Sequence, residues 1–306
     1  MNKKPLLIIA GPTAVGKTAF SLELAERIGG EIVSADSMQV YRGMDIGSAK
    51  ATAEERARVP HHLIDVLEPT EEFNIVRFQN LAHEAMKGIY GRGRIPILTG
   101  GTGFYIQSVL YDIAFTEHET DPAYRASLYR QAEEEGADAL FARLVEVDPE
   151  SAAAIPKNNV KRIARALEFF HETGLPISAH NAAERAKESP YDFRYFVLTM
   201  DRKRLYERIG LRVDRMMEDG FLEEVRRLKA QGCTGDMTSM QGLGYRQLLR
   251  YLNGEGTLSE AVEQTKTETR HFAKRQLTWF RRERDTVWID VEKENPIDVY
   301  ETRPVG

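Results

Sequence analysis

The sequence predicts an α/β protein, with a parallel sheet covered by helices and an all-helical insertion. Apolar runs typical of buried strands alternate with amphipathic stretches typical of helices, as in parallel sheets. From about residue 119 to residue 189 this pattern gives way to helical stretches without a strand-like run. We therefore expect an α/β core formed by residues 1–118 and 190–306, and a helical domain formed by residues 119–189.

The expected elements follow along the chain in this order. Residues 6–10 form an apolar run of strand length, and residues 17–28 carry Phe20, Leu24 and Ile28 on one helical stripe. Further strands are expected in the runs GEIVSADS, RIPILTGG, RYFVLTMD and DTVWID. Further helices are expected in FYIQSVLY, YRASLYRQAEEEGADALFARL, VKRIARALEFFHETG and RLYERIGLRVDRMMEDGFLEEVRRLKAQG, the last broken near Gly220.

Composition limits the classes of protein. The chain has 306 residues, 42% of them hydrophobic, and no stretch approaches the ~20 apolar residues of a membrane span. A single cysteine, Cys233, excludes an internal disulfide and favours a cytoplasmic protein, and no base near it in sequence marks it as a catalytic thiol. The adjacent His61 and His62 lack partners at the spacing of zinc ligands. The formal net charge of -5 argues against a uniformly basic nucleic-acid-binding protein but leaves room for local basic faces.

A segment after the first expected strand fits the phosphate-binding pattern G-x-x-x-x-G-K-S/T. It reads GPTAVGKT and comprises Gly11, Pro12, Thr13, Ala14, Val15, Gly16, Lys17 and Thr18. Its glycines let backbone N–H groups point into an anion-sized concavity at a helix N-terminus, its lysine supplies positive charge to phosphate oxygens, and its last threonine can bind Mg²⁺. The strand before it and the helix after it predict a P-loop NTPase-like core that holds a diphosphate or triphosphate.

Asp36 follows the second expected strand, at the sheet edge where open α/β sheets bind ligands. Its carboxylate could hold Mg²⁺ through water or act as a general base, and a turn or helix-capping aspartate explains the sequence equally well. A phosphate-loop kinase or ATPase usually has an acidic metal ligand after another apolar strand. Here that strand ends in GGTG, residues 100–103, which weakens the interpretation as an NTP-hydrolysing enzyme.

Two segments are rich in basic residues. KNNVKRIAR, residues 157–165, carries cations and no acid. In SEAVEQTKTETRHFAKRQLTWFRRER, helical periodicity places on one stripe Lys266, Arg270, Lys274 and Arg281. The opposite side carries residues that can pack on a core, namely Val262, Thr269, Phe272, Trp279 and Phe280. Each basic segment is either a solvated face or a track for a phosphate backbone.

Taken together, the motifs resemble those of one family, the bacterial tRNA dimethylallyltransferases, also called tRNA isopentenyltransferases. The matching segments are GPTAVGKT, SADSMQVYRGMDIGSAK, PHHLID, ILTGGTGFY, VKRIARALE, GLGYRQ and KRQLTWFR, in the family's order from residue 11 to residue 281. The resemblance covers nearly the whole chain. One position differs, because Gly103 stands where the family often has a bulkier apolar residue.

The resemblance implies transfer of a dimethylallyl group from dimethylallyl diphosphate to N6 of adenosine 37 in tRNA, with diphosphate as the leaving group. Residues 11–18 would bind the diphosphate. Thr13, Lys17 and Arg212 would stabilise the charge that grows on it, with Mg²⁺ as a cofactor held by Thr18. Asp36 would accept the amine proton as a general base.

The resemblance also implies a set of tRNA contacts. The corresponding residues are Asp36, Ser37, Met38, Gln39, Thr102, Arg125, Lys161, Arg162, Arg165, Gln241, Gly242, Leu243, Gly244, Tyr245, Arg246, Lys274, Arg275, Gln276 and Arg281. Two of these stretches coincide with the basic segments found from composition. The helical domain would close over the anticodon stem-loop, and we expect a monomer without membrane association.

Three other functions share parts of this pattern. A small-molecule kinase would use the loop for ATP and Asp36 as a base toward a hydroxyl group, without need of the C-terminal basic helix. A free-nucleotide isopentenyltransferase would act on AMP or ADP and would not use an RNA track. A non-catalytic RNA-binding protein with a decayed loop would have no reason to keep Lys17, Thr18 and Asp36.

Overall fold

The computed structural model of the chain describes residues 3–115 and 121–302. The chain divides into two compact units. Unit 1 comprises residues 1–110 and 190–306, and unit 2 comprises residues 111–189. The expected boundary between residues 118 and 119 lies outside the described residues.

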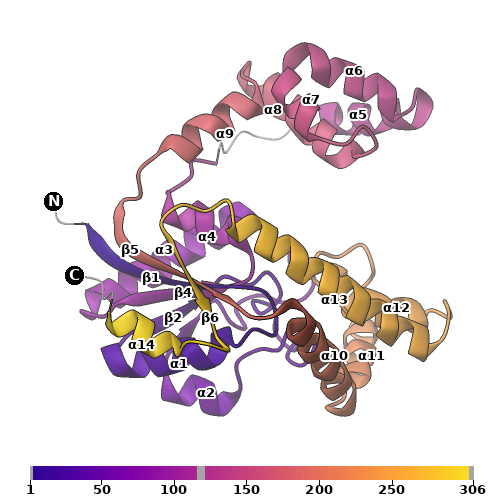
Figure 1. Cartoon of the computed structure of the whole chain (residues 1–306). Coiled ribbons are helices and arrows are strands. Elements are labelled where there is room, and N and C mark those ends of the chain that lie inside the picture. Colours follow the sequence, from indigo (N-terminus) through magenta and orange to yellow (C-terminus); the bar gives the residue numbers. More distant parts are fainter. Residues whose placement is uncertain (1–2, 116–120, 303–306) are drawn as a thin grey trace. The chain divides into compact units, whose positions relative to one another are not determined.

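A parallel sheet forms the centre of unit 1, and its described strands have the order β3-β2-β4-β1-β5-β6 (Figure 1). The strands are β1 Lys4–Ala10, β2 Glu31–Ser34, β3 His61–His62, β4 Pro96–Gly100, β5 Tyr191–Thr199 and β6 Thr286–Asp290. At the centre, Ile8 of β1 pairs with Leu98 of β4 and Tyr195 of β5. The expected α/β class is confirmed. The sequence did not predict β3, because two residues are too few to show a periodic pattern.

Helices cover both faces of this sheet (Figure 1). On one face lie α1 Lys17–Ile28, α2 Ala53–Arg58 and α14 Pro296–Glu301, and on the other lie α3 Ile75–Gly91 and α4 Gly103–Leu110. Leu7 and Ile9 of β1 join Phe20 and Leu24 of α1 in one core cluster, and the alternate residues of β1 are also fully buried. A strand covered on both faces needs a continuous apolar run, which is the pattern seen in the sequence.

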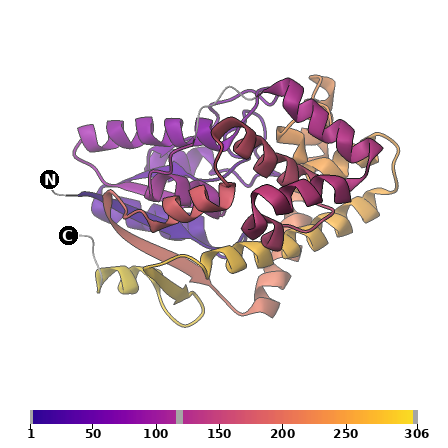
Figure 2. The same cartoon turned by 90° about the horizontal axis from the view of Figure 1, so that it is seen from above.

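A group of helices in unit 1 lies beyond the carboxyl ends of the strands (Figures 1 and 2). It consists of α10 Arg202–Glu218, α11 Phe221–Ala230, α12 Tyr245–Leu252 and α13 Leu258–Phe280. Gly220 separates the first two helices at φ 99°, a left-handed conformation that glycine adopts without steric cost. A capping box between Thr257 and Glu260 starts α13, which packs against α4, α10 and α12. These contacts bring α13 to the ends of the strands.

All the regular elements among the described residues of unit 2 are helices, so the expected helical insertion is confirmed. Its helices are α5 Pro122–Glu134, α6 Ala137–Val147, α7 Pro149–Ala154, α8 Val160–Thr173 and α9 Ile177–Ala186. Leu128, Leu140, Leu144 and Leu167 belong to a core cluster of its own. Neither unit has a helix, within the described ranges, that is long and apolar enough to cross a membrane.

Candidate active site

A cavity of about 1270 Å³ opens at the carboxyl ends of β1, β2 and β4, and all of its lining residues belong to unit 1. The loop after β1 contributes Lys17 and Thr18, the loop after β2 contributes Asp36, and the turn after β4 contributes Thr102. Helix α10 adds Arg212 from a distant part of the sequence. The fold therefore gathers the four predicted catalytic residues and five of the eight predicted diphosphate-binding residues around one space, while Gly11, Pro12 and Val15 do not line it.

The phosphate loop, residues 11–18, has the backbone needed to bind an anion. Gly11, Ala14 and Gly16 all have positive φ angles, of 147°, 66° and 111°. A Cβ at Gly11 would lie 2.7 Å from the carbonyl oxygen of Leu198, so this position has no room for a side chain. Gly16 is the N-cap of α1, and no side chain caps that end of the helix. The first N–H groups of α1 thus remain available to a bound anion.

Lys17 is held inside this loop. Its ammonium group donates hydrogen bonds to the carbonyl oxygens of Gly11 at 3.0 Å and Pro12 at 2.9 Å. Burial, together with the positive charge of Arg212, lowers the pKa of Lys17 to about 8, although the carboxylate of Asp36 acts in the opposite direction. A cation with so little solvation is well suited to bind a diphosphate.

Asp36 forms the turn that the sequence allowed, and its side chain also lines the cavity. Its Oδ1 accepts hydrogen bonds from the backbone N–H groups of Met38 at 2.8 Å and Gln39 at 3.4 Å, which is the turn-forming use of an aspartate. Its Oδ2 has no hydrogen-bond partner among residues 3–115 and 121–302, and the side chain lines the cavity. One carboxylate oxygen is thus free for chemistry while the other sets the geometry of the turn.

Arg212 is the second cation beside Asp36. Burial lowers the pKa of Arg212, the charge of Asp36 raises it, and the neighbouring Arg208 lowers it. Arg212 also acts on the pKa of Lys17. Two cations that repel each other next to one carboxylate create a net positive field, which an anionic ligand would relieve.

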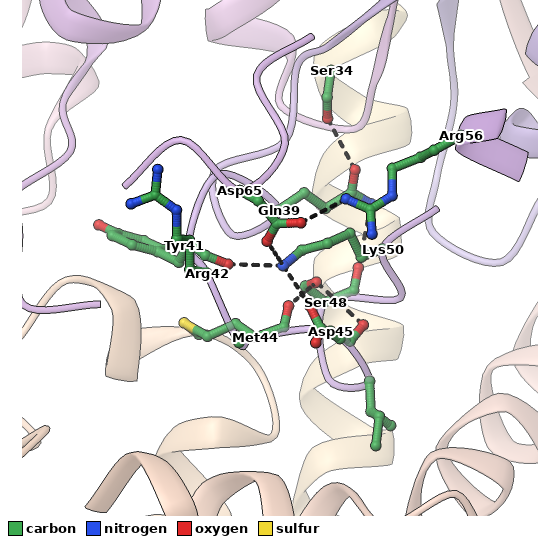
Figure 3. Close-up of polar contacts among 12 residues, drawn as sticks. Ser34, Gln39, Tyr41, Arg42, Met44, Asp45, Ser48, Lys50, Arg56 and Asp65 are labelled. Atoms are coloured by element: carbon green, nitrogen blue, oxygen red, sulfur yellow. Dashed lines mark hydrogen bonds and ion pairs between the residues drawn. The ribbon is translucent and has the colours of Figure 1, made fainter. Parts of the chain in front are cut away.

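The loop that carries Asp36, residues 35–50, is fixed from within (Figure 3). Gln39 accepts a hydrogen bond from the Ser34 hydroxyl at 3.0 Å and donates to the carbonyl oxygens of Ser48 and Ala49. The buried ammonium of Lys50 donates to the Tyr41 carbonyl oxygen at 2.8 Å. It also donates to the carboxylates of Asp45 and Asp65, at 2.6 Å each. Gln39 thus supports the loop and also lines the cavity, and its tRNA contact stays a prediction.

Glu224 of α11 holds the same loop from outside, and sequence reasoning missed it. Its side chain is 2% exposed and accepts the backbone N–H groups of Asp45, Ile46 and Gly47 at 2.9, 2.8 and 3.1 Å. It also accepts the Tyr245 hydroxyl at 2.6 Å. Nothing in the local pattern EEVRR, residues 223–227, indicates that Glu224 is buried, because its backbone partners lie far away in the sequence.

The GLGYRQ motif packs closely against the Asp36 loop. A Cβ at Gly242 would lie 2.8 Å from the sulfur of Met38, and a Cβ at Gly47 would overlap Phe221 and Tyr245. Tyr245 is fully buried. Among the other predicted tRNA contacts here, Gln241 is exposed and bonds to the Gly235 carbonyl, Leu243 is half-buried, Gly244 is buried, and Arg246 forms an ion pair with Glu268 of α13. The buried members of the motif shape the site from inside.

Helix α13 presents fewer free cations than its periodicity predicts. Lys266 is only 15% exposed and forms ion pairs with Asp214 of α10 and Glu263. The Nε atom of Arg270 is buried without a hydrogen-bond partner in the described part of the chain. The expected stripe is therefore half covered by α10, because a helix that packs on two neighbours buries a wider arc than its apolar residues indicate. Lys274, Arg275 and Arg281 are exposed.

The apolar side of α13 also differs from the expectation in part. Phe280 is fully buried, whereas Phe272 and Trp279 are half-buried. Trp279 occupies the space that a side chain at Gly103 would need, which explains the glycine at the position where the resemblance led us to expect a larger residue.

The remaining predicted contacts lie in unit 2. Arg125 forms a two-pronged ion pair with the buried Glu168, and Arg165 lies near the same carboxylate at 3.9 Å. Lys161 and Arg162 are exposed on α8. This unit therefore presents a cationic patch on its own surface, part of which is oriented by an internal acid.

Within the described residues, no group of three or more His, Cys, Asp or Glu side chains could hold a metal ion. The predicted metal ligand Thr18 lines the cavity together with Asp36. Mg²⁺ often takes one or two protein ligands and completes its shell with substrate phosphates and water, so this donor set fits Mg²⁺ only in company with a diphosphate. His61 and His62 are engaged elsewhere, with the Val59 carbonyl and the Glu31 carboxylate, at 2.7 Å each.

Comparison with known proteins places the chain in one family. Sequence profiles described as IPP transferase and isopentenyl transferase match residues 39–283 and 4–65. The tRNA dimethylallyltransferase of Lachnoclostridium phytofermentans is 55% identical over 95% of this chain and 93% of its own length, and that of Bacillus subtilis is 50% identical over 97% and 94%.

Solved structures agree with the sequence comparison. A full-length tRNA isopentenylpyrophosphate transferase from Bacillus halodurans is 43% identical, with a TM-score of 0.73 over 98% of this chain and 94% of that chain. A eukaryotic dimethylallyltransferase, described as acting on tRNA, is 29% identical, with a TM-score of 0.78 over 98% of this chain and 76% of that chain. Since the family profile, the relatives and the fold all cover nearly the whole length, this chain belongs to the IPP transferase family.

Proposed function

We propose that this protein is a tRNA dimethylallyltransferase that transfers the dimethylallyl group of dimethylallyl diphosphate to N6 of adenosine 37 in tRNAs. The observation that carries the proposal is a single cavity lined by a phosphate-binding loop and by a carboxylate with one free oxygen. A prenyl transfer to an amine needs both groups, since one must hold the leaving diphosphate and the other must take a proton.

The phosphate loop stabilises the leaving group. As the C–O bond of the substrate lengthens, cationic character grows on the allylic carbon and negative charge grows on the diphosphate. The free N–H groups at the start of α1, the ammonium of Lys17, the guanidinium of Arg212 and the hydroxyl of Thr13 would stabilise that charge. The Thr18 hydroxyl would hold Mg²⁺ together with the substrate, and the ion would then supply further positive charge.

Asp36 acts as the general base. The lone pair of the exocyclic amine forms the new C–N bond while the C–O bond pair leaves with the diphosphate. The proton released from N6 passes to Oδ2 of Asp36, the oxygen that the turn does not use. Holding Oδ1 in two backbone hydrogen bonds fixes the direction of the accepting oxygen, which favours proton transfer without side-chain reorganisation.

The target base of the RNA would enter this cavity after leaving its stack. Single-stranded loops are where RNA bases can be turned out and read at their edges, and a cavity of about 1270 Å³ has room for a base beside a prenyl diphosphate. Exposed cations would bind the RNA backbone. They are Lys274 and Arg275 of α13, Arg281 directly after it, and Lys161, Arg162 and Arg165 of α8. We further propose that the enzyme works as a monomer in the cytoplasm.

The proposal is tested by incubating the protein with radiolabelled dimethylallyl diphosphate and unmodified tRNA, with AMP and ATP in separate reactions. We expect label in tRNA, and none in a matched tRNA that carries guanosine at position 37, since guanosine lacks the N6 amine. Label in AMP instead of tRNA would identify a free-nucleotide transferase. Phosphoryl transfer from ATP without any prenyl transfer would identify a kinase and overturn the proposal.

A further inference from the structure

Gln276 of α13 connects two loops of the active site. Its side chain is 5% exposed, its Oε1 accepts the backbone N–H of Thr13 at 3.0 Å, and its Nε2 donates to the carbonyl oxygen of Gly101 at 2.9 Å. Thr13 belongs to the phosphate loop after β1, and Gly101 belongs to the turn after β4. One amide therefore crosslinks the ends of two neighbouring strands.

The turn after β4 is shaped around this amide. A Cβ at Gly101 would overlap the Nε2 of Gln276, and a Cβ at Gly103 would overlap Trp279, one helical turn further along α13. Glycine at both positions lets α13 lie directly on the turn. No other side chain in the described part of the chain accepts a hydrogen bond from a backbone N–H of the phosphate loop. The hydrogen-bonded contact of the loop with α13 thus depends on one residue.

We propose that Gln276 is a positioning residue for the phosphate loop rather than a residue that contacts RNA. By occupying the N–H of Thr13, it leaves the Thr13 hydroxyl as the group that this residue offers to a diphosphate, and it holds the loop in its anion-binding form before substrate arrives. This inference deepens the proposed function and rests on it for the identity of the diphosphate. Helix α13 then serves both substrates. Its exposed cations bind RNA, and its buried amide positions the loop that binds the diphosphate.

The inference is tested with Gln276→Met, which keeps the volume of the side chain but removes both hydrogen bonds. The probe is inorganic pyrophosphate, measured by calorimetry, and the control is Gln264→Met, the same change at an exposed glutamine of the same helix. We expect the dissociation constant of pyrophosphate to rise about two- to tenfold in Gln276→Met, the range that one net hydrogen bond contributes. We expect no rise in the control, and affinity for an anticodon stem-loop RNA should be unchanged in both variants.

A second variant, Gly101→Ala, displaces the amide without changing its chemistry, because the new Cβ overlaps Nε2. It should weaken pyrophosphate binding to a similar degree, and the double variant should be no weaker than either single one, since both changes break the same connection. Unchanged pyrophosphate affinity in folded Gln276→Met protein, or a loss confined to RNA binding, would overturn the inference. The pyrophosphate measurement needs neither tRNA nor turnover, so a wild-type protein that binds pyrophosphate without prenylating tRNA would contradict the proposed function alone.

Discussion

Replacing Glu224 by glutamine should destabilise unit 1 and displace the loop that carries Asp36. The carboxylate accepts four hydrogen bonds in a buried site, two backbone N–H groups on Oε2 and one backbone N–H and the Tyr245 hydroxyl on Oε1. A glutamine at this position has only one acceptor oxygen. Its amide nitrogen would face two of the four donors, and an amide nitrogen cannot accept from them.

The expected cost follows from that count. Hydrogen bonds to a charged group contribute ~1.5–3 kcal/mol each, so two lost bonds predict a loss of about 3–6 kcal/mol in the free energy of unfolding. Tyr245→Phe removes one bond and leaves three, so we expect it to cost about half as much or less. Glu224→Gln should therefore lose more unfolding free energy than Tyr245→Phe.

Urea unfolding followed by tryptophan fluorescence measures this directly, because both tryptophans, Trp279 and Trp288, belong to unit 1. Glu223→Gln is the matched control, since Glu223 precedes Glu224 on the same helix but its side chain is 68% exposed. The control should stay within ~0.5 kcal/mol of wild type. A Glu224→Gln variant as stable as this control would show that the loop does not depend on the buried carboxylate, and the reasoning would fail.

Three further predictions concern the reaction. Asp36→Asn keeps the acceptor for the Met38 N–H but cannot take a proton. Turnover with tRNA should therefore fall ~100-fold while pyrophosphate affinity is retained. Near-normal turnover would mean that another residue is the base. Because burial lowers the pKa of Lys17 to about 8, its charge is present below pH 8 and lost above it, so the KM for dimethylallyl diphosphate should rise by up to roughly tenfold per pH unit above 8. Lys17→Arg should abolish that rise, and a pH-independent KM in wild type would contradict the role of Lys17. Lys274, Arg275 and Arg281 are exposed, and neutralising them together should weaken the dependence of tRNA binding on salt. The slope of log K against log salt concentration should drop by ~0.7–0.9 per lost phosphate contact, with pyrophosphate affinity unchanged. Equal slopes for variant and wild type would mean that this surface is only solvated.

Local sequence patterns predicted the five longer strands of the sheet, helices such as α1, and the residues at the centre of the cavity. Residues 17–28 were expected as a helix and form α1 over the same residues, and the continuous apolar run before them is a strand buried on both faces. The phosphate loop could be recognised because glycine spacing, lysine and threonine act within eight neighbouring residues. Asp36 could be placed in the same cavity because parallel strands end at one edge of the sheet.

Long-range contacts decided which polar residues are buried and hydrogen-bonded within the protein. Gln276 and Tyr245 belong to motifs that predict RNA contacts, yet both are buried and bonded to partners on other elements. Lys266 lies on a stripe that periodicity assigns to solvent, but α10 covers it with Asp214. Glu224 gave no signal at all. The physical reason is that periodicity describes one element at a time, whereas the burial and hydrogen bonding of a polar side chain depend on the surfaces that tertiary packing brings against it.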